Sequence, residues 1–198
     1  MHIYTEQTFN IPELKGISRK AIDAHLKLYS GYVKNVNLIN DKIAEYRADS
    51  EKHAYALSEL QRRFSFEFNG MRNHEYYFSS LEDGPVELEE EAELRHALKK
   101  QWGSFDAWKE QFVQLAKTRG VGWAVLSYDP HVKKLIHGWV DEQHIGHLLH
   151  LAPVLMLDMW EHSYVHDYHP SGKANYIDDF FANLNWSVID GHFESSRL

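Results

Sequence analysis

Metal chemistry is the chemistry that this chain's side chains suit best, through four residues: His25, His74, Asp158 and His162. Imidazole nitrogen suits first-row transition metals, and a carboxylate in the same set shifts the preference toward iron or manganese. Asp158 and His162 are four residues apart, so one short segment can supply two ligands. The other two come from distant segments, and a shared ion would tie these segments together.

Each of these residues also has an ordinary structural interpretation. His25 falls on the apolar face of an expected helix and His74 lies among aromatic residues, where a histidine is more often a hydrogen-bonded core residue. Asp158 is harder to explain in this way, because it directly follows the apolar segment 153–157. A carboxylate at the end of a buried strand needs a metal, a cation or several N–H donors nearby.

The composition indicates a globular protein without the features of a nucleic-acid or membrane partner. Of the 198 residues 43% are hydrophobic, the aromatic content is high, and the formal net charge of −8 comes without a basic stripe. No apolar run approaches the roughly 20 residues that span a bilayer, and the N-terminus lacks the apolar region of a signal peptide. Because cysteine is absent, we expect a cytoplasmic protein without disulfides or thiolate metal sites.

The elements that must position the four residues follow from hydrophobic periodicity and helix-end signals. A helix is expected from residue 17 to about 46, with Ser18 as its N-cap and His25 on its apolar face. A second helix over 50–80 carries His74.

A glycine inside the second expected helix needs a reason. Gly70 costs the helix about 1 kcal/mol relative to alanine. Further along, the turn at 83–85 (Asp-Gly-Pro) is the strongest internal boundary. It divides the chain into an N-terminal helical hairpin domain (1–84) and a C-terminal α/β domain (85–198).

The C-terminal part mixes helices with about three strands. Helices are expected over 87–100, 104–118 and 176–184, and strands over 123–128, 134–140 and 153–157. The expected fold class is therefore α+β, an N-terminal helical hairpin followed by a mixed domain whose small antiparallel sheet is flanked by helices.

The segment 158–164, Asp-Met-Trp-Glu-His-Ser-Tyr, resembles the signature of the iron/manganese superoxide dismutases. Other segments resemble the same family in the family's order and together cover nearly the whole chain: 17–25, 73–78, 102–105, 120–124 and 185–186.

The resemblance implies that the three histidines and the aspartate bind one iron or manganese ion per chain, with a solvent molecule as fifth ligand. Trp123 and Trp160 would be walls beside the ion. The implied reaction is the disproportionation of superoxide to O2 and H2O2, with the metal cycling between its 3+ and 2+ states. A protein that keeps the fold and the metal but has lost the redox activity is the alternative.

The resemblance also implies a homodimer, possibly a tetramer. In the family the glutamate of the Trp-Glu-His motif reaches across a two-fold axis to the ligand histidine of the partner. Glu161 and His162 would thus form a reciprocal bridge, in which a carboxylate accepts the second N–H of a ligating imidazole.

Four positions depart from the family pattern, and two of them lie in the first expected helix, which in the family carries the tyrosine that guards the substrate channel. Tyr29 stands where the family usually has a histidine, and Val33 stands where it has the gateway tyrosine. Tyr32 is seven residues beyond His25 and faces nearly the same direction on a helix. We favour Tyr32 as the gateway, with Tyr29 as the alternative. The third departure is Val165, where a tyrosine that bonds the missing histidine is common.

The fourth departure concerns the side chain that bonds the metal-bound solvent. Iron-type members take a glutamine from the place where this chain has Gly70, whereas manganese-type members take a glutamine or histidine from the C-terminal half. Gln143 and His144 both lie near the matching place, and Gln143 fits the spacing slightly better. Gly70 is then interpreted as leaving room for that side chain, or as a close helix crossing. The choice between iron and manganese stays open.

Other interpretations are weaker. A di-metal carboxylate site needs Glu-x-x-His pairs on two helices, and Glu93 with His96 is one such pair without a second. A zinc hydrolase motif His-Glu-x-x-His is absent. Because the substrate of the implied reaction is an anion, positive side chains are expected near its entrance, and the candidates are Lys27, Lys34 and Arg72.

Overall fold

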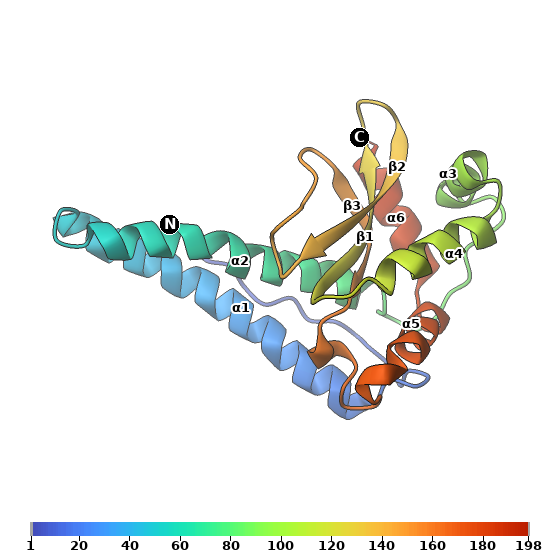
Figure 1. Ribbon diagram of the computed structural model, residues 1–198, viewed down its shortest axis with the longest axis horizontal. Helices are drawn as coiled ribbons and strands as arrows, with labels where there is room; N and C mark the ends of the chain where they lie inside the picture. The colour runs from blue at the N-terminus through green and yellow to red at the C-terminus, as the bar shows by residue number, and fades with distance from the viewer. Residues whose placement is uncertain (1, 198) are drawn as a thin grey trace.

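The N-terminal half is a hairpin of two long antiparallel helices (Figure 1). The computed structural model describes residues 2–197. Helix α1 runs over Arg19–Tyr46 and begins where Ser18 accepts a hydrogen bond from the backbone N–H of Ala21. Its buried residues recur every three to four positions, as the periodicity predicted: Ala21, Ile22, His25, Tyr29, Val33, Val36, Ile39 and Ile43.

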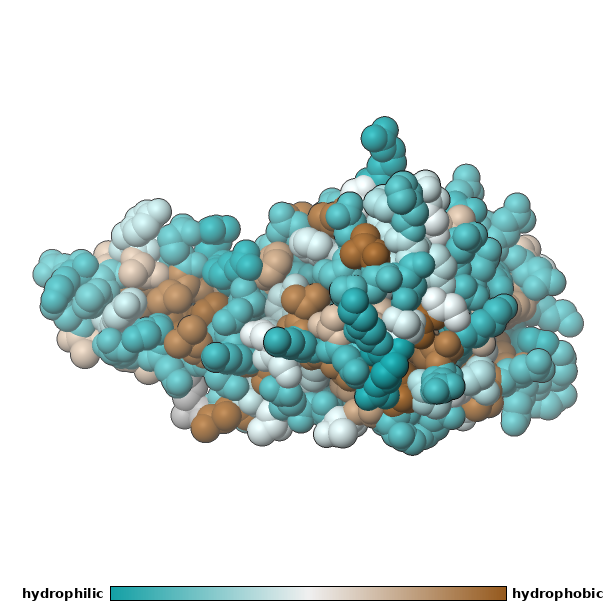
Figure 2. All heavy atoms as spheres, turned by 90° about the horizontal axis from the view of Figure 1, so that it is seen from below, coloured by the Kyte–Doolittle hydropathy of each residue, from teal (hydrophilic) through white to brown (hydrophobic). Residues whose placement is uncertain are grey.

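Helix α2, Ala54–Ser79, returns along α1 after a short 3-10 helix η1, Arg47–Asp49. The hairpin extends well beyond the rest of the molecule in Figure 1. In Figure 2 the surface is mostly hydrophilic, with apolar side chains gathered in patches that include the hairpin. The predicted turn follows α2, and Asp83 and Gly84 both take positive φ there, 59° and 85°.

The C-terminal half contains a three-stranded antiparallel sheet in the order β2-β1-β3, with β1 over Gly122–Asp129, β2 over Lys134–Asp141 and β3 over Ala152–Asp158. The central strand β1 is buried along nearly its whole length, because its two neighbours satisfy its backbone and helices cover the sheet. Its register places Trp123 opposite Asp158. The expected fold class is confirmed.

The C-terminal half also contains four helices: α3 (Glu93–Trp102), α4 (Phe105–Ala116), α5 (Lys173–Ala182) and α6 (Trp186–Ser196). Of these, α3, α4 and α6 pack against strands of the sheet. Two short 3-10 helices, η2 (Glu161–Ser163) and η3 (Pro170–Gly172), lie between β3 and α5. No helix within residues 2–197 combines the length and apolarity that crossing a membrane requires.

The predicted start of the third helix at residue 87 is wrong, because α3 begins only at Glu93. Val86 instead forms an isolated parallel bridge with Asn185, and its backbone N–H donates to the carbonyl of Leu184. This extended pairing holds the acidic segment 87–92 out of a helix, although its composition favours one. The helix expected over 176–184 begins earlier, at Lys173, and ends at Ala182.

Aromatic side chains join the two halves. The ring of Tyr77 on α2 stacks on Phe180 of α5 at 5.4 Å between centroids. The hydroxyl of Tyr176 donates to the hydroxyl of Tyr77 at 3.2 Å, and all three residues are fully buried. This aromatic layer sets the hairpin against the C-terminal half where the four candidate ligands meet.

Candidate metal centre

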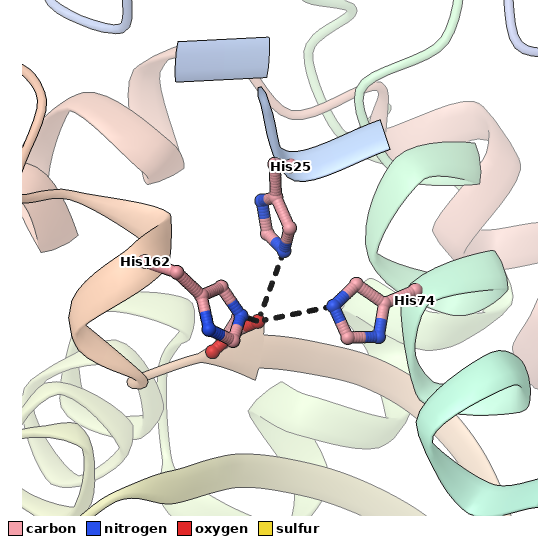
Figure 3. Close-up of side chains that lie close together, drawn as sticks. His25, His74 and His162 are labelled. Carbon is pink, nitrogen blue, oxygen red and sulfur yellow. Dashed lines mark hydrogen bonds and ion pairs between the residues drawn. The ribbon is translucent and has the colours of Figure 1, made fainter. Parts of the chain in front are cut away.

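Four different elements deliver the four candidate ligands to one point, and Figure 3 shows the rings of the three histidines pointing toward it. His25 comes from α1, His74 from α2, Asp158 from the last position of β3 and His162 from η2. One ligand atom of each lies within 4.8 Å of those of the others. The Nε2 atoms of His25, His162 and His74 lie 3.1, 3.0 and 3.7 Å from Oδ2 of Asp158.

Packing fixes the two histidines of the hairpin. The rings of His25 and His74 lie 4.9 Å apart, and the ring of Phe78 packs against that of His25. Nδ1 of His74 lies 2.6 Å from the carbonyl oxygen of Gly70. A carbonyl only accepts, so the proton of His74 is on Nδ1 and the lone pair on Nε2 faces the centre of the cluster.

This lone pair is the clearest sign that the cluster is suited to hold a cation. Nε2 of His74 is buried and has no hydrogen-bond partner among the residues that the structure describes. A buried polar atom without a partner costs about 1–3 kcal/mol, and a metal ion removes that cost. Three imidazoles and one carboxylate form the donor set that suits iron or manganese, so the residues fit such an ion.

Local hydrogen bonds fix Asp158. Its Oδ1 accepts from the backbone N–H of Trp160 at 2.8 Å, which leaves Oδ2 for the three histidines. Its carbonyl accepts from the hydroxyl of Ser163 at 3.1 Å. His162 is the most accessible of the four ligands, with 22% of its side chain exposed.

The protonation states also suit a metal. Burial, with the nearby His25, lowers the pKa of His74 to about 3, and burial lowers the pKa of His25. Burial alone would raise the pKa of Asp158, but His162 and His25 more than offset this and hold it below its usual range. A neutral imidazole and an ionised carboxylate are the forms that bind a cation without first releasing a proton, and the shifts of His25, His74 and Asp158 favour these forms.

The two tryptophans expected as walls lie beside ligands. Trp123, at the start of β1, is fully buried, and its ring meets that of His74 edge-on at 5.0 Å. Trp160 stacks on His162 at 5.7 Å. The indole of Trp160 also donates to the carbonyl of Glu142, which anchors it to the loop after β2.

A chain of hydrogen bonds continues outward from the centre. The indole N–H of Trp123 donates to Oε1 of Gln143 at 2.9 Å, so the amide nitrogen of Gln143 points the other way. That nitrogen donates to the hydroxyl of Tyr32 at 3.0 Å. The ring of Tyr32 lies 5.1 Å from that of His74. Gln143 is fully buried.

The two alternatives left open by the sequence lie elsewhere. The hydroxyl of Tyr29 accepts from the backbone N–H of Gln7 and donates to Glu75, so it ties the N-terminal segment to α2. His144 packs edge-on against Phe66 at 5.6 Å, and no hydrogen bond joins it to a candidate ligand in the described part of the chain. The geometry therefore brings Tyr32 and Gln143 to the centre.

The geometry decides between the two interpretations of Gly70. A Cβ atom at this position would lie 2.5 Å from Cδ1 of Tyr32. The glycine therefore makes room for the ring of Tyr32 from α1, as a close crossing of the two helices requires, and not for a side chain from the C-terminal half. The sequence could not choose between the two, because the contact depends on how the two helices of the hairpin are aligned.

Asn73 has a structural role that was not predicted from the sequence. Its side-chain amide is buried and donates to the backbone carbonyl of Gln143 at 3.0 Å. Asn73, directly before the candidate ligand His74, therefore holds the loop that carries Gln143. An asparagine directly before a candidate ligand was the only signal for this role in the sequence.

Comparison with known proteins agrees with the geometry. Residues 90–192 match the family of iron/manganese superoxide dismutases, C-terminal domain. An iron superoxide dismutase from Cupriavidus metallidurans is 35% identical over 187 residues, which cover 93% of this chain and 92% of that protein. The iron enzyme of Aquifex aeolicus is 31% identical, with 92% and 87% covered, and the manganese enzyme of Mycolicibacterium smegmatis 33% identical, with 87% and 82% covered. On this evidence the chain belongs to the iron/manganese superoxide dismutase family.

Proposed function

We propose that this protein is a superoxide dismutase, which converts two superoxide anions and two protons into O2 and H2O2 at a single iron or manganese site. The observation that carries the proposal is the convergence of four ligand atoms at one point, in a chain that belongs to this family. Among these atoms is Nε2 of His74, which has no hydrogen-bond partner in the described part of the chain. His25, His74, Asp158 and His162 would hold the ion. When bound, iron or manganese supplies a one-electron change between the 2+ and 3+ states, which zinc lacks.

The side chains around the ion have separate tasks. The carboxylate of Asp158 offsets part of the positive charge, and the hydrogen bond from His74 to Gly70 fixes the ring and raises its basicity. Trp123 and Trp160 restrict access of water from two sides. The buried aromatic surroundings keep these interactions strong, because the local dielectric constant is low.

Tyr32 and Gln143 would deliver protons to the product. Gln143 uses its carbonyl oxygen for Trp123 and donates to the hydroxyl oxygen of Tyr32, so the proton of that hydroxyl remains free to be donated. Burial raises the pKa of Tyr32 well above its usual value, which keeps the hydroxyl protonated at neutral pH. Tyr32 would give a proton to the peroxide and regain one from solvent.

A homodimer would complete the environment of His162. Glu161 is exposed beside the partly exposed His162, as an isologous bridge requires. In the proposed dimer, Glu161 accepts a hydrogen bond from His162 of the partner subunit. The exposed hairpin residues Leu38 and Tyr55 give a candidate surface for a tetramer.

The lack of cysteine supports a cytoplasmic location.

Metal reconstitution tests the proposed reaction. The metal-free protein would be loaded separately with iron, manganese and zinc, and metal content and superoxide dismutation would be measured on the same samples. We expect activity that scales with occupancy for iron or manganese and no activity with zinc. Full occupancy by iron and by manganese without activity would support the alternative, a family member that has lost the reaction.

A further inference from the structure

One side of α2 continues outward from the metal centre. His74, Gly70, Glu67 and Arg63 follow one another at spacings of three to four residues, so they lie on the same side of the helix. At 1.5 Å per residue, Arg63 lies about 16 Å from His74 along the axis. Exposure increases in the same direction, from fully buried His74 to exposed Arg63.

Aromatic rings connect the two ends of this row. Tyr32 lies over Gly70 with its ring 5.1 Å from that of His74, and the ring of Phe66 follows at 6.1 Å from that of Tyr32. The guanidinium carbon of Arg63 lies 3.6 Å from the centre of the Phe66 ring, a close cation–π contact. Tyr32 and Phe66 are half-buried, so the centre comes near solvent on this side.

A second contact holds Arg63 in place. Its Nε lies 2.9 Å from Oε1 of Glu67, whose side chain is only 6% exposed. Glu67 also accepts a hydrogen bond from Asn35 on α1 at 3.2 Å. Arg63 is half-exposed and thus presents a fixed positive charge at the surface, and it offsets the negative charge of the Glu67 carboxylate on the same side of the helix.

The positive residues expected from the sequence are not placed in this way. Arg72 is two residues from His74, on the other side of α2, and its guanidinium binds Glu75 at 2.6 Å. Lys27 and Lys34 are exposed, and each is two residues from a centre-facing residue of α1, His25 and Tyr32. Their side chains therefore leave α1 away from the centre.

We propose that Arg63, held by Phe66 and Glu67, steers superoxide toward Tyr32 and the metal centre. The inference rests on the proposed function. The protein carries a net charge of −8, so a diffusing anion is repelled on average and needs a local positive charge at its point of entry. Arg63 would act on the approach of the substrate and not on the chemical step.

Ionic strength separates steering from a structural role. The interaction reaches far in dilute salt, because the Debye length is about 30 Å at 0.01 M and about 3 Å at 1 M. We expect Arg63→Gln to lower kcat/KM about 3- to 10-fold at low ionic strength, and the deficit to close as salt rises. Glu67→Gln should change kcat/KM in the opposite direction, and Arg63→Lys should keep most of the wild-type value.

Arg62→Gln is the matched control. It removes the same charge one position away, from a side chain that is 70% exposed and paired with Glu59. It should leave kcat/KM and its salt dependence close to wild type. Equal salt dependence of Arg63→Gln and Arg62→Gln would overturn the inference, as would a deficit of Arg63→Gln that persists at 1 M salt.

Anion binding gives a readout that does not depend on turnover. Azide, a small monoanion, would be titrated into the metal-loaded proteins and its Kd followed by absorbance. We expect a weaker Kd for Arg63→Gln than for Arg62→Gln at low salt, and an unchanged Kd would count against steering. A wild-type protein that binds metal and azide without dismutating superoxide would refute the proposed function alone.

Discussion

The hairpin and the C-terminal half each supply two of the four candidate ligands, but they hold them by different means. His25 and His74 are 2% and 0% exposed and lie within helices of 28 and 26 residues, where aromatic rings surround them. Asp158 and His162 lie at a strand end and in a three-residue 3-10 helix, and backbone hydrogen bonds orient the aspartate.

The two halves therefore differ in what keeps a ligand side chain in position. A residue within a long packed helix can move only if the helix or its neighbours move, because the interior is close-packed. A residue in a short loop segment depends on a few hydrogen bonds. The hairpin therefore offers a fixed pair of imidazoles, and the C-terminal half adds a charge and a partly exposed third imidazole.

Asp158→Asn should produce the largest effect, because it removes the charge that all three histidines face. Metal occupancy should fall from about one to below about 0.1 per chain after purification and reconstitution, since the carboxylate is the only anionic ligand in the set. Metal analysis checks this, with Asp178→Asn on exposed α5 as the control for charge. Normal occupancy in Asp158→Asn would break the comparison, because the charge that the C-terminal half contributes would then not be needed.

Gln143→Ala tests the hydrogen bonds that run from Trp123 in the C-terminal half through Gln143 to Tyr32 in the hairpin. The substitution removes the acceptor of the Trp123 indole and the donor to Tyr32, and it leaves the four ligands in place. We expect kcat to fall about 100-fold while occupancy stays above half, within the range typical of general acid–base groups. Gln114→Ala on the exposed side of α4 should leave kcat unchanged. An unaltered kcat in Gln143→Ala would remove this residue from the proton path.

Gly70→Ala tests the close packing inside the hairpin. The new Cβ would lie 2.5 Å from the Tyr32 ring, so the ring or the helix must shift, and the free energy of unfolding should fall by about 1–3 kcal/mol. Gly31→Ala on α1 is a matched control, since its Cβ would meet nothing within 4 Å. That control should gain up to about 1 kcal/mol from helix propensity. Equal effects in chemical denaturation would show that the hairpin is more adaptable than we infer.

The pH dependence of the metal-free protein gives a smaller effect. Burial lowers the pKa of His74 from an ordinary 6.5 to about 3, so between these values the unfolded chain binds a proton that the folded chain does not. Stability is thus lost as pH falls below 6.5, by about 1 kcal/mol between pH 6.5 and 5.5. Denaturation of the wild type and His74→Gln checks this, and the variant should lose about 1 kcal/mol less. Parallel curves for the two proteins would contradict the burial argument.

Much of the hairpin could be predicted from the sequence because long amphipathic helices repeat their pattern many times. The ends of α1 and the cap at Ser18 follow from local signals. The start of α3 could not be predicted, because the pairing of Val86 with Asn185 joins positions 99 residues apart in sequence (185 − 86). Local composition alone favours a helix there.

The candidate site shows the same limit. The four ligands could be identified from residue type and motif. The choice between Gln143 and His144 could not, because the two are neighbours in one loop and the backbone conformation of that loop decides which side chain faces the centre. The reason for Gly70 and the place of Arg63 both depend on Tyr32, whose position over α2 follows from the alignment of two helices. Contacts of this kind are set by tertiary packing.

The most direct measurement is an anomalous difference map from crystals of the protein loaded with iron or manganese. We predict one strong peak per chain, within bonding distance of Nε2 of His25, His74 and His162 and of Oδ2 of Asp158. Such a peak would show that both halves hold the same ion. A peak that lacks the hairpin histidines or lies in another part of the chain, or crystals that take up no metal, would contradict the convergence on which the proposed function rests.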